Sequence, residues 1–206
     1  GEMQPLSEGS TARGICPAWP VGEAGEPAYS AATGLLYIAA SQLCMDFEPR
    51  DGSYLPGTPY TGAYVRMRPA RRAAGALIAW DVVARRPAWQ VDERFPLRGG
   101  VELTPGGVLS YGTLDGTVKA LDARDGRVLW QQRLGSGVVA RPTAFQGPDG
   151  HAWLAVLAGA GPVAGMPAPS EMDLRDATAV KGLAGVLHDL PPPAESGGRL
   201  TVFRAP

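Results

Sequence analysis

The feature that most constrains the fold of this chain is an internal repeat. Ala79-Trp80-Asp81 is followed, eight residues after the aspartate, by Trp89, and Ala120-Leu121-Asp122 is followed at the same interval by Trp130. The two copies lie 41 residues apart and share the pattern A-x-D-x₇-W. A period of about 40 residues that holds about four short strands is typical of a β-propeller blade. The repeat therefore predicts a propeller, with blade motifs at 79–89 and 120–130.

Such a repeat has a physical reason, which is that the faces of each blade must be shielded from water by its neighbours. A four-stranded blade cannot cover both of its faces alone, so it stacks on its neighbours, and a tryptophan at a fixed place fills the gap. The second copy has Asp125-Gly126 between its strands, a strong hairpin signal, whereas the first has Arg85-Arg86 there and is degenerate. The alternative is two unrelated hairpins in a β-sandwich.

Glycine and proline exclude long helices. The 28 glycines and 20 prolines make up 48 of the 206 residues, and an interior proline costs a helix about 3 kcal/mol and a glycine about 1 kcal/mol. The hydrophobic content of 45% nevertheless indicates a real core. We therefore expect an all-β chain of short strands and tight turns. Further strands are predicted at 34–39, 107–111 and 153–157, with a closing strand at 199–204.

One segment departs from the strand pattern. Asp176 is a suitable helix N-cap, and apolar residues follow at a spacing of three or four from Val180 to Leu190. Two glycines weaken this pattern, and the prolines at 191–193 end it. We predict a short helix at about 176–190, inserted before the closing strand.

The charge excludes several kinds of partner. Nineteen basic and 20 acidic residues give a net charge of −1, so there is no basic surplus for binding a nucleic acid. The longest uncharged stretch, 152–170, contains three glycines and three prolines and does not suit a transmembrane helix. The first residues contain no basic or apolar region, so no signal peptide is visible, as expected of an excised or truncated piece.

Several separate motifs then point to one family. They are RGICP at 13–17, PAYS at 27–30, TGLLY at 33–37, CMDFEP at 44–49, YGTLDG at 111–116 and GGRLTVF at 197–203. In order and spacing the chain resembles the pyrroloquinoline-quinone (PQQ) dependent alcohol dehydrogenases of the methanol and ethanol type. It matches only about the C-terminal third of such an enzyme, which is an eight-bladed propeller. The resemblance implies that residues 1–206 form a partial propeller domain of at most about four blades.

What the resemblance implies for function is periplasmic oxidation of a primary alcohol to an aldehyde. PQQ would lie on the propeller axis with Ca²⁺ or a lanthanide, and electrons would pass to a cytochrome c. The family's metal ligands and catalytic aspartate belong to the missing part, so we expect neither here and expect the fragment alone to be inactive. Its partners would be a small alcohol, the cytochrome and the remaining blades. The alternative is a non-catalytic propeller, a pseudoenzyme or a module that binds a ligand or partner, derived from the same family.

The two cysteines, Cys16 and Cys44, lie 28 residues apart. Taken alone, they are compatible with buried thiols. The family pairs the cysteine of its I-C-P segment with that of its C-M-D segment, so the resemblance implies a Cys16–Cys44 disulfide, a bond that persists in exported proteins. Closing this loop would stabilise the fold by roughly 3 kcal/mol.

The resemblance also places three cofactor contacts. The family has a polar residue between the I-C-P segment and the next tyrosine, and this position is Glu23 or Ala24, depending on the end from which one counts. Arg98 stands where the family has a tryptophan before Gly-Gly, and a guanidinium can stack on or pair with a tricarboxylated quinone. Ala164 is expected near the cofactor in a loop where Val163 replaces another tryptophan. Two lost pocket tryptophans indicate a remodelled substrate mouth or weaker PQQ binding.

The remaining polar candidates are interpreted as structural. Asp81 and Asp122 are the turn aspartates of the two blade motifs, and Asp115-Gly116 is typical of a hairpin turn. His151 and His188 are 37 residues apart, without the spacing of metal ligands, and are expected on the surface.

Overall fold

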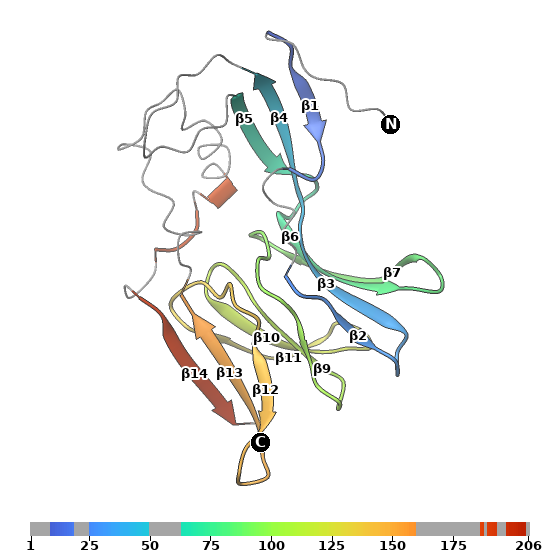
Figure 1. The fold of residues 1–206 in the computed structure, drawn as a ribbon, viewed down its shortest axis with the longest axis vertical. Helices are drawn as coiled ribbons and strands as arrows, with labels where there is room; N and C mark the ends of the chain where they lie inside the picture. Colours follow the sequence, from blue (N-terminus) through green and yellow to red (C-terminus); the bar gives the residue numbers. More distant parts are fainter. Residues whose placement is uncertain are drawn as a thin grey trace.

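The computed structural model describes residues 9–18, 25–49, 63–159, 186–187, 189–192 and 197–204. Within these residues, 14 strands form four antiparallel sheets (Figure 1). Blade I has the order β2 (Ala28–Ser30), β3 (Leu35–Ser41), β6 (Gly75–Asp81), β7 (Arg86–Glu93). Blade II contains β8 (Glu102–Leu103), β9 (Val108–Gly112), β10 (Thr117–Asp122) and β11 (Val128–Arg133), and blade III contains β12 (Thr143–Gln146), β13 (Ala152–Ala158) and β14 (Arg199–Arg204).

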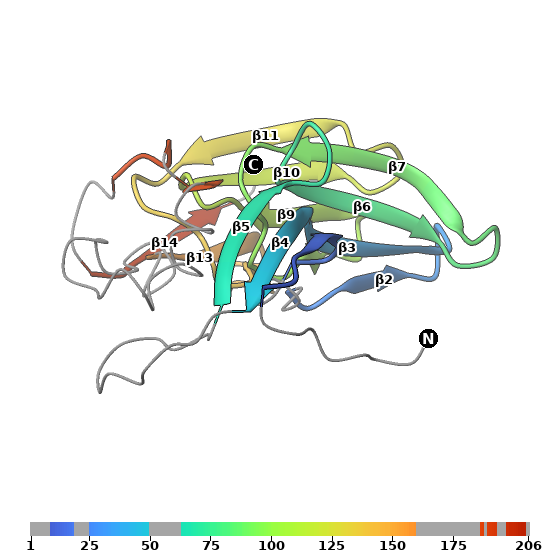
Figure 2. The ribbon, with the colours of Figure 1, turned by 90° about the horizontal axis from the view of Figure 1, so that it is seen from above.

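The three blades stack on one another (Figure 2), and buried apolar side chains fill the space between them. Between blades I and II the core includes Tyr37, Leu77 and Leu109, all with essentially no exposed surface. Between blades II and III it includes Val118 and Val156. Each blade thus covers a face of the next, and the predicted all-β propeller architecture is confirmed, as are the strands predicted around residues 34–39, 107–111, 153–157 and 199–204.

The repeat found in the sequence is also a structural repeat. Ala79 pairs with Trp89 across β6 and β7, and Ala120 pairs with Trp130 across β10 and β11. In both hairpins the register shifts next to that alanine, which places the same bulge in both blades. The motif therefore specifies the two outer strands of a blade, including their bulge.

Each motif tryptophan packs on the following blade. Trp89 donates its indole N–H to the carbonyl oxygen of Ala123 in blade II (3.3 Å), and the Trp130 ring meets that of Phe203 in blade III with centroids 4.8 Å apart. These contacts fill the gaps between blades, as the repeat predicts.

The fourth sheet is not a blade but an extension of blade I, and the sequence did not predict it. Its order is β1 (Ala12–Ile15), β4 (Leu43–Pro49), β5 (Ala63–Pro69). Strand β3 runs into β4 through Gln42, and the chain returns from β5 to β6, so the sheet is inserted between the second and third strands of the blade (Figure 1). It has its own small core around Leu43, Val65 and Met67.

The predicted helix is described only in part. Val186 and Leu187 have helical backbone and pack against the core of the extension sheet. Asp189 and Leu190 are already outside the helix, and most of the segment 176–190 lies outside the described residues. In the described part of the chain no helix has the length and apolar character needed to span a membrane.

Candidate functional site

Two kinds of link in each blade lie at the same end of the sheet. Because strands alternate in direction, the link from second to third strand and the link from one blade to the next lie at the same end. The N–H of Val138 donates to the carbonyl of Thr113 (2.9 Å), and the N–H of Gly159 donates to that of Gly137 (2.7 Å). We call this the connecting end. The extension sheet also leaves blade I here.

Backbone contacts between glycines pack the connecting end tightly. A Cβ on Gly25 would lie 2.0 Å from the carbonyl oxygen of Gly99, and one on Gly100 would lie 3.1 Å from the nitrogen of Glu26. The N–H of Val101 donates to the Glu26 carbonyl at 3.0 Å. Only glycine allows backbones to approach so closely. The Gly-Gly pair thus fixes the segment that carries Arg98.

Arg98 is the one predicted cofactor residue that the structure describes. Its side chain is half-buried between the buried residues Leu97 and Gly99, and Ser41 Oγ donates to the Leu97 carbonyl (3.1 Å). Among the described residues it has no hydrogen-bond or ion-pair partner. A partly desolvated guanidinium without a carboxylate beside it suits an anionic ligand.

The other predicted contacts lie outside the described residues. These are Glu23, its alternative Ala24, Val163 and Ala164. The described residue Gly25 lies against Gly99, and Gly159 lies beside Gly137. The chain therefore leaves the described part at the connecting end on the way to both segments.

An ion cluster at the connecting end was not predicted. Arg141 contacts the Glu26 carboxylate at 2.8 Å and the Glu102 carboxylate at 2.6 Å, and Glu102 also accepts the N–H of Ala144 (3.2 Å). Hydrogen bonds to Glu26 and Glu102 raise the pKa of Arg141. The cluster joins the entries to all three blades. Its members are far apart in the sequence, and no motif could have grouped them.

A second unpredicted cluster lies between blades I and II. The Glu93 carboxylate accepts a hydrogen bond from the Tyr111 hydroxyl and contacts Lys119 Nζ at 2.6 Å. All three side chains are largely buried. Burial, with the neighbouring Glu93 charge second, raises the pKa of Tyr111 well above its usual range. Since a buried carboxylate needs a partner, the cluster is an electrostatic link between blades.

The residues interpreted as structural behave as predicted. Asp81 accepts the N–H groups of Val83 and Ala84, and Asp122 accepts that of Arg124 (2.9 Å). Gly116 has a φ of 87° in the turn between β9 and β10. The side chain of His151 is exposed; His188 lies outside the described residues.

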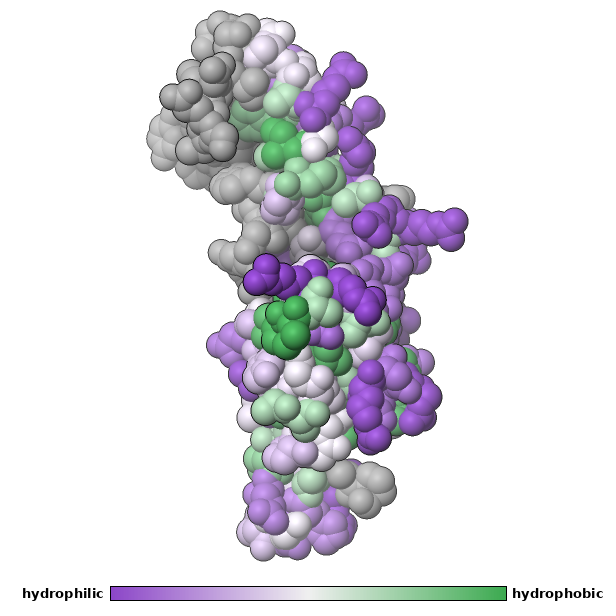
Figure 3. Space-filling model, turned by 90° about the vertical axis from the view of Figure 1, so that its right-hand side faces the viewer, coloured by the Kyte–Doolittle hydropathy of each residue, from purple (hydrophilic) through white to green (hydrophobic). Residues whose placement is uncertain are grey.

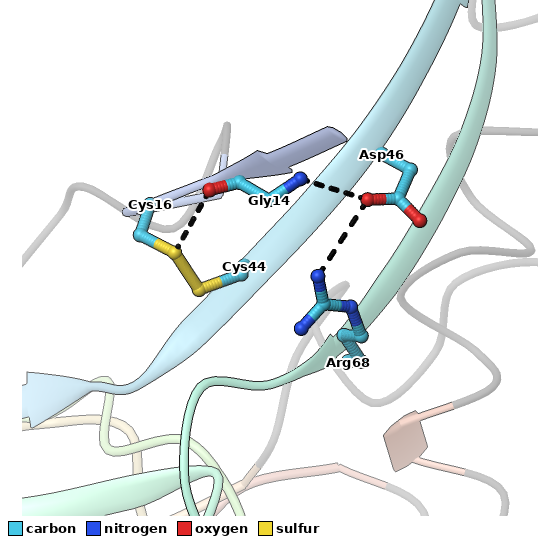
Figure 4. The surroundings of a disulfide bond; sticks show 5 residues. All are labelled: Gly14, Cys16, Cys44, Asp46 and Arg68. Atoms are coloured by element: carbon cyan, nitrogen blue, oxygen red, sulfur yellow. Dashed lines mark hydrogen bonds and ion pairs between the residues drawn. A yellow bond between two sulfur atoms is a disulfide. The ribbon is translucent and has the colours of Figure 1, made fainter. Parts of the chain in front are cut away.

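The disulfide between Cys16 and Cys44 is present and joins β1 to β4 (Figure 4). Beside it, Asp46 Oδ1 accepts the N–H of Gly14 (2.8 Å) and lies 3.7 Å from Arg68 Nη2. The bond therefore braces the extension sheet rather than a blade.

Outside the clusters described above, the described residues add little to the predicted site. In the described part of the chain no group of three His, Cys, Asp or Glu side chains is placed to hold a metal ion. An open groove of about 540 Å³ lies at the opposite end, among turns that include Thr33, Pro105 and Arg124. Arg98 does not line this groove.

Three stacked blades, two of which share the tryptophan motif, define the chain as part of a β-propeller. A family model described as outer membrane protein assembly factor BamB (PQQ_2) matches residues 73–148. The chain is 37% identical to a lanthanide-dependent methanol dehydrogenase of Methylacidiphilum fumariolicum over 95% of its length and 33% of the relative's. It is 33% identical to a quinoprotein ethanol dehydrogenase of Pseudomonas aeruginosa over 100% of its length and 31% of the relative's.

Solved structures agree with these matches. A europium-containing methanol dehydrogenase superposes with a TM-score of 0.81 at 36% identity, over 96% of this chain and 36% of that one. The chain is therefore a relative of the PQQ-dependent alcohol dehydrogenases of the methanol and ethanol type. It spans about a third of the length of the curated relatives that it matches.

Proposed function

We propose that these residues are the C-terminal blades of a periplasmic PQQ-dependent alcohol dehydrogenase. The whole protein would oxidise a primary alcohol to an aldehyde and pass the electrons to a cytochrome c. The observation that carries the proposal is the superposition on a methanol dehydrogenase over 96% of the chain. The Cys16–Cys44 disulfide supports the periplasmic location, because disulfides persist in exported proteins.

The contribution of this chain is a wall of the cofactor site at the connecting end. When bound, PQQ supplies an electrophilic quinone that accepts the hydride of the alcohol. Arg98 would hold a carboxylate of the cofactor, and the packed Gly99 and Gly100 would keep the guanidinium in place. The expected metal, Ca²⁺ or a lanthanide, would take its ligands from other parts of the protein.

The fragment would not catalyse the reaction by itself. Among the described residues, the connecting end carries Arg98. Its carboxylates Glu26 and Glu102 both form ion pairs with Arg141, so neither is free to act as a base. A general base must reach the proton that it removes. As the resemblance to the family implies, we place the proton-accepting group in the remaining blades.

Reconstitution of the full-length protein tests this function. With PQQ and either Ca²⁺ or La³⁺, methanol or ethanol is expected to drive the reduction of an artificial dye. Arg98 at the family's tryptophan position is what favours the second candidate, a non-catalytic propeller. No alcohol-dependent dye reduction with either metal would support that candidate and contradict the dehydrogenase.

A further inference from the structure

The extension sheet has one covered face and one exposed face. Along β5, Val65 and Met67 are buried, whereas Tyr64, Arg66 and Arg68 are exposed. Because side chains alternate across a strand, the three exposed residues share one face. Two more exposed arginines follow in the turn after β5, and another lies on β1. We call this set the arginine surface: Arg13, Arg66, Arg68, Arg71 and Arg72.

The arginine surface concentrates positive charge in a chain that is acidic as a whole. The described residues of the extension, 9–18, 43–49 and 63–74, contain these five arginines and two acidic residues, Asp46 and Glu48, a net charge of +3. The whole chain has a net charge of −1. The charge is therefore a local feature of this sheet. In Figure 3, strongly hydrophilic side chains project over the upper part of the molecule, where this sheet lies.

The part of the surface around Arg68 is held in place by contacts with β1 and β4. The guanidinium of Arg68 reaches over β4 and lies 3.7 Å from Asp46 and 3.6 Å from the position of a Cβ on Gly14, next to Arg13 (Figure 4). The disulfide fixes β1 to β4 beneath it. Among the described residues the other four arginines have no ion-pair partner, so their charges remain available.

The surface also stands beside the connecting end. Ser41, at the end of β3 where the extension begins, donates to the carbonyl of Leu97, one residue from Arg98. At the return into β6, a Cβ on Gly75 would lie 2.1 Å from the carbonyl oxygen of Phe95. The base of the extension is therefore packed on the segment that carries the proposed cofactor contact.

We infer that the arginine surface is the docking site for an acidic protein. Arginine and tyrosine are the residues enriched at protein interfaces, guanidinium groups bind carboxylates in pairs, and Tyr64 is 42% exposed among the arginines. Asp46 and Glu48 interrupt the positive charge, which suits a protein of complementary pattern better than the uniform charge of a polyphosphate or a lipid layer.

The identity of this acidic protein rests on the proposed function: it is the c-type cytochrome that accepts the electrons. Oxidation of one alcohol to its aldehyde releases two electrons and two protons. Each docking reduces one ferric haem to ferrous, so two successive dockings complete the cycle and the protons pass to solvent. Positive charge at the docking site raises the rate of encounter with an acidic acceptor.

The experiment uses the full-length protein loaded with PQQ and metal, and an acidic c-type cytochrome as the acceptor. Arg71→Glu/Arg72→Glu reverses two charges in the exposed turn, and we expect the KM for the cytochrome to rise about tenfold at low salt and the rise to shrink at high salt. Dye-linked activity and melting temperature are expected to stay unchanged. The matched control is Arg127→Glu, in the turn between β10 and β11 at the opposite end.

The possible outcomes separate the two proposals. If the double variant and wild type have the same KM for the cytochrome, the docking site is wrong, and equal effects of the double variant and the control also overturn it. Loss of binding to anionic phosphatidylglycerol vesicles with unchanged cytochrome kinetics would identify a membrane surface instead. If the wild type reduces no dye, the proposed function fails. Docking is then decided by direct binding of the same oxidised cytochrome to wild type and variant, where weaker binding of the variant supports it and equal binding overturns it.

Discussion

The indole of Trp89 occupies the space in which a side chain on Gly126 would begin: a Cβ there would lie 2.7 Å from Trp89 Cε3. The tryptophan belongs to blade I and the glycine to the outer turn of blade II. Gly126 also has a φ of 74°, a conformation that glycine adopts without cost. One position of the repeat therefore serves both the turn and the contact between blades.

Gly126→Ala is expected to destabilise the protein by roughly 2–4 kcal/mol. The added methyl carries the cost of left-handed backbone and also collides with the indole. The control is Gly107→Ala, which has a φ of 78° but no atom within 4 Å of the new Cβ and should cost only about 1 kcal/mol. Thermal unfolding of the full-length variants measures both. Equal losses of stability in the two variants would show that the Trp89 indole moves to accommodate the methyl group and that the contact between blades I and II is loose.

Arg85→Gly is expected to stabilise blade I by about 0.5–1 kcal/mol. Arg85 lies 41 residues before Gly126, at the same turn position, and has a φ of 54°. A non-glycine residue is strained in this region, and glycine relieves the strain at some cost in chain entropy. A rise in melting temperature would confirm the strain. A fall in melting temperature would mean that contacts of the Arg85 side chain stabilise the fold by more than the strain costs.

Arg141→Ala should cost about 1 kcal/mol at low salt, because it breaks the two ion pairs with Glu26 and Glu102, which are partly exposed to water. Arg141→Lys keeps the charge and is expected to lose less. The cost of the alanine variant should decrease in 1 M NaCl, since salt screens the ion pairs. A cost independent of salt would assign the effect to packing of the Arg141 side chain against Gly100.

Stability is expected to fall as the pH rises above about 10. Burial raises the pKa of both Tyr111 and Tyr37, so these phenols stay protonated in the folded state at pH values where the unfolded chain has lost the protons. The folded state then binds more protons, and stability decreases by up to about 1.4 kcal/mol per pH unit for each tyrosine. Tyr111→Phe should give a shallower decrease between pH 10 and 11. An unchanged slope would show that Tyr111 titrates as an ordinary phenol.

The parts of this molecule that the sequence predicted are those encoded by nearby residues. The pattern from Ala79 to Trp89 specifies one hairpin with its bulge, and its copy 41 residues later repeats it. The extension sheet was missed because β1, β4 and β5 lie outside the 41-residue repeat and are brought together only by the fold. The Arg141 cluster was missed because Glu26 and Glu102 lie 115 and 39 residues away, and only the stacking of three blades brings them together.

The most direct test of the account is the affinity of the full-length protein for PQQ when Arg98 is changed. Arg98→Met keeps the length of the side chain and removes its charge, so titration followed by quenching of tryptophan fluorescence is expected to show PQQ binding at least about tenfold weaker than in wild type. Arg127→Met, at the opposite end, should bind PQQ as wild type does. Equal affinity of Arg98→Met and wild type would contradict a cofactor site at the connecting end.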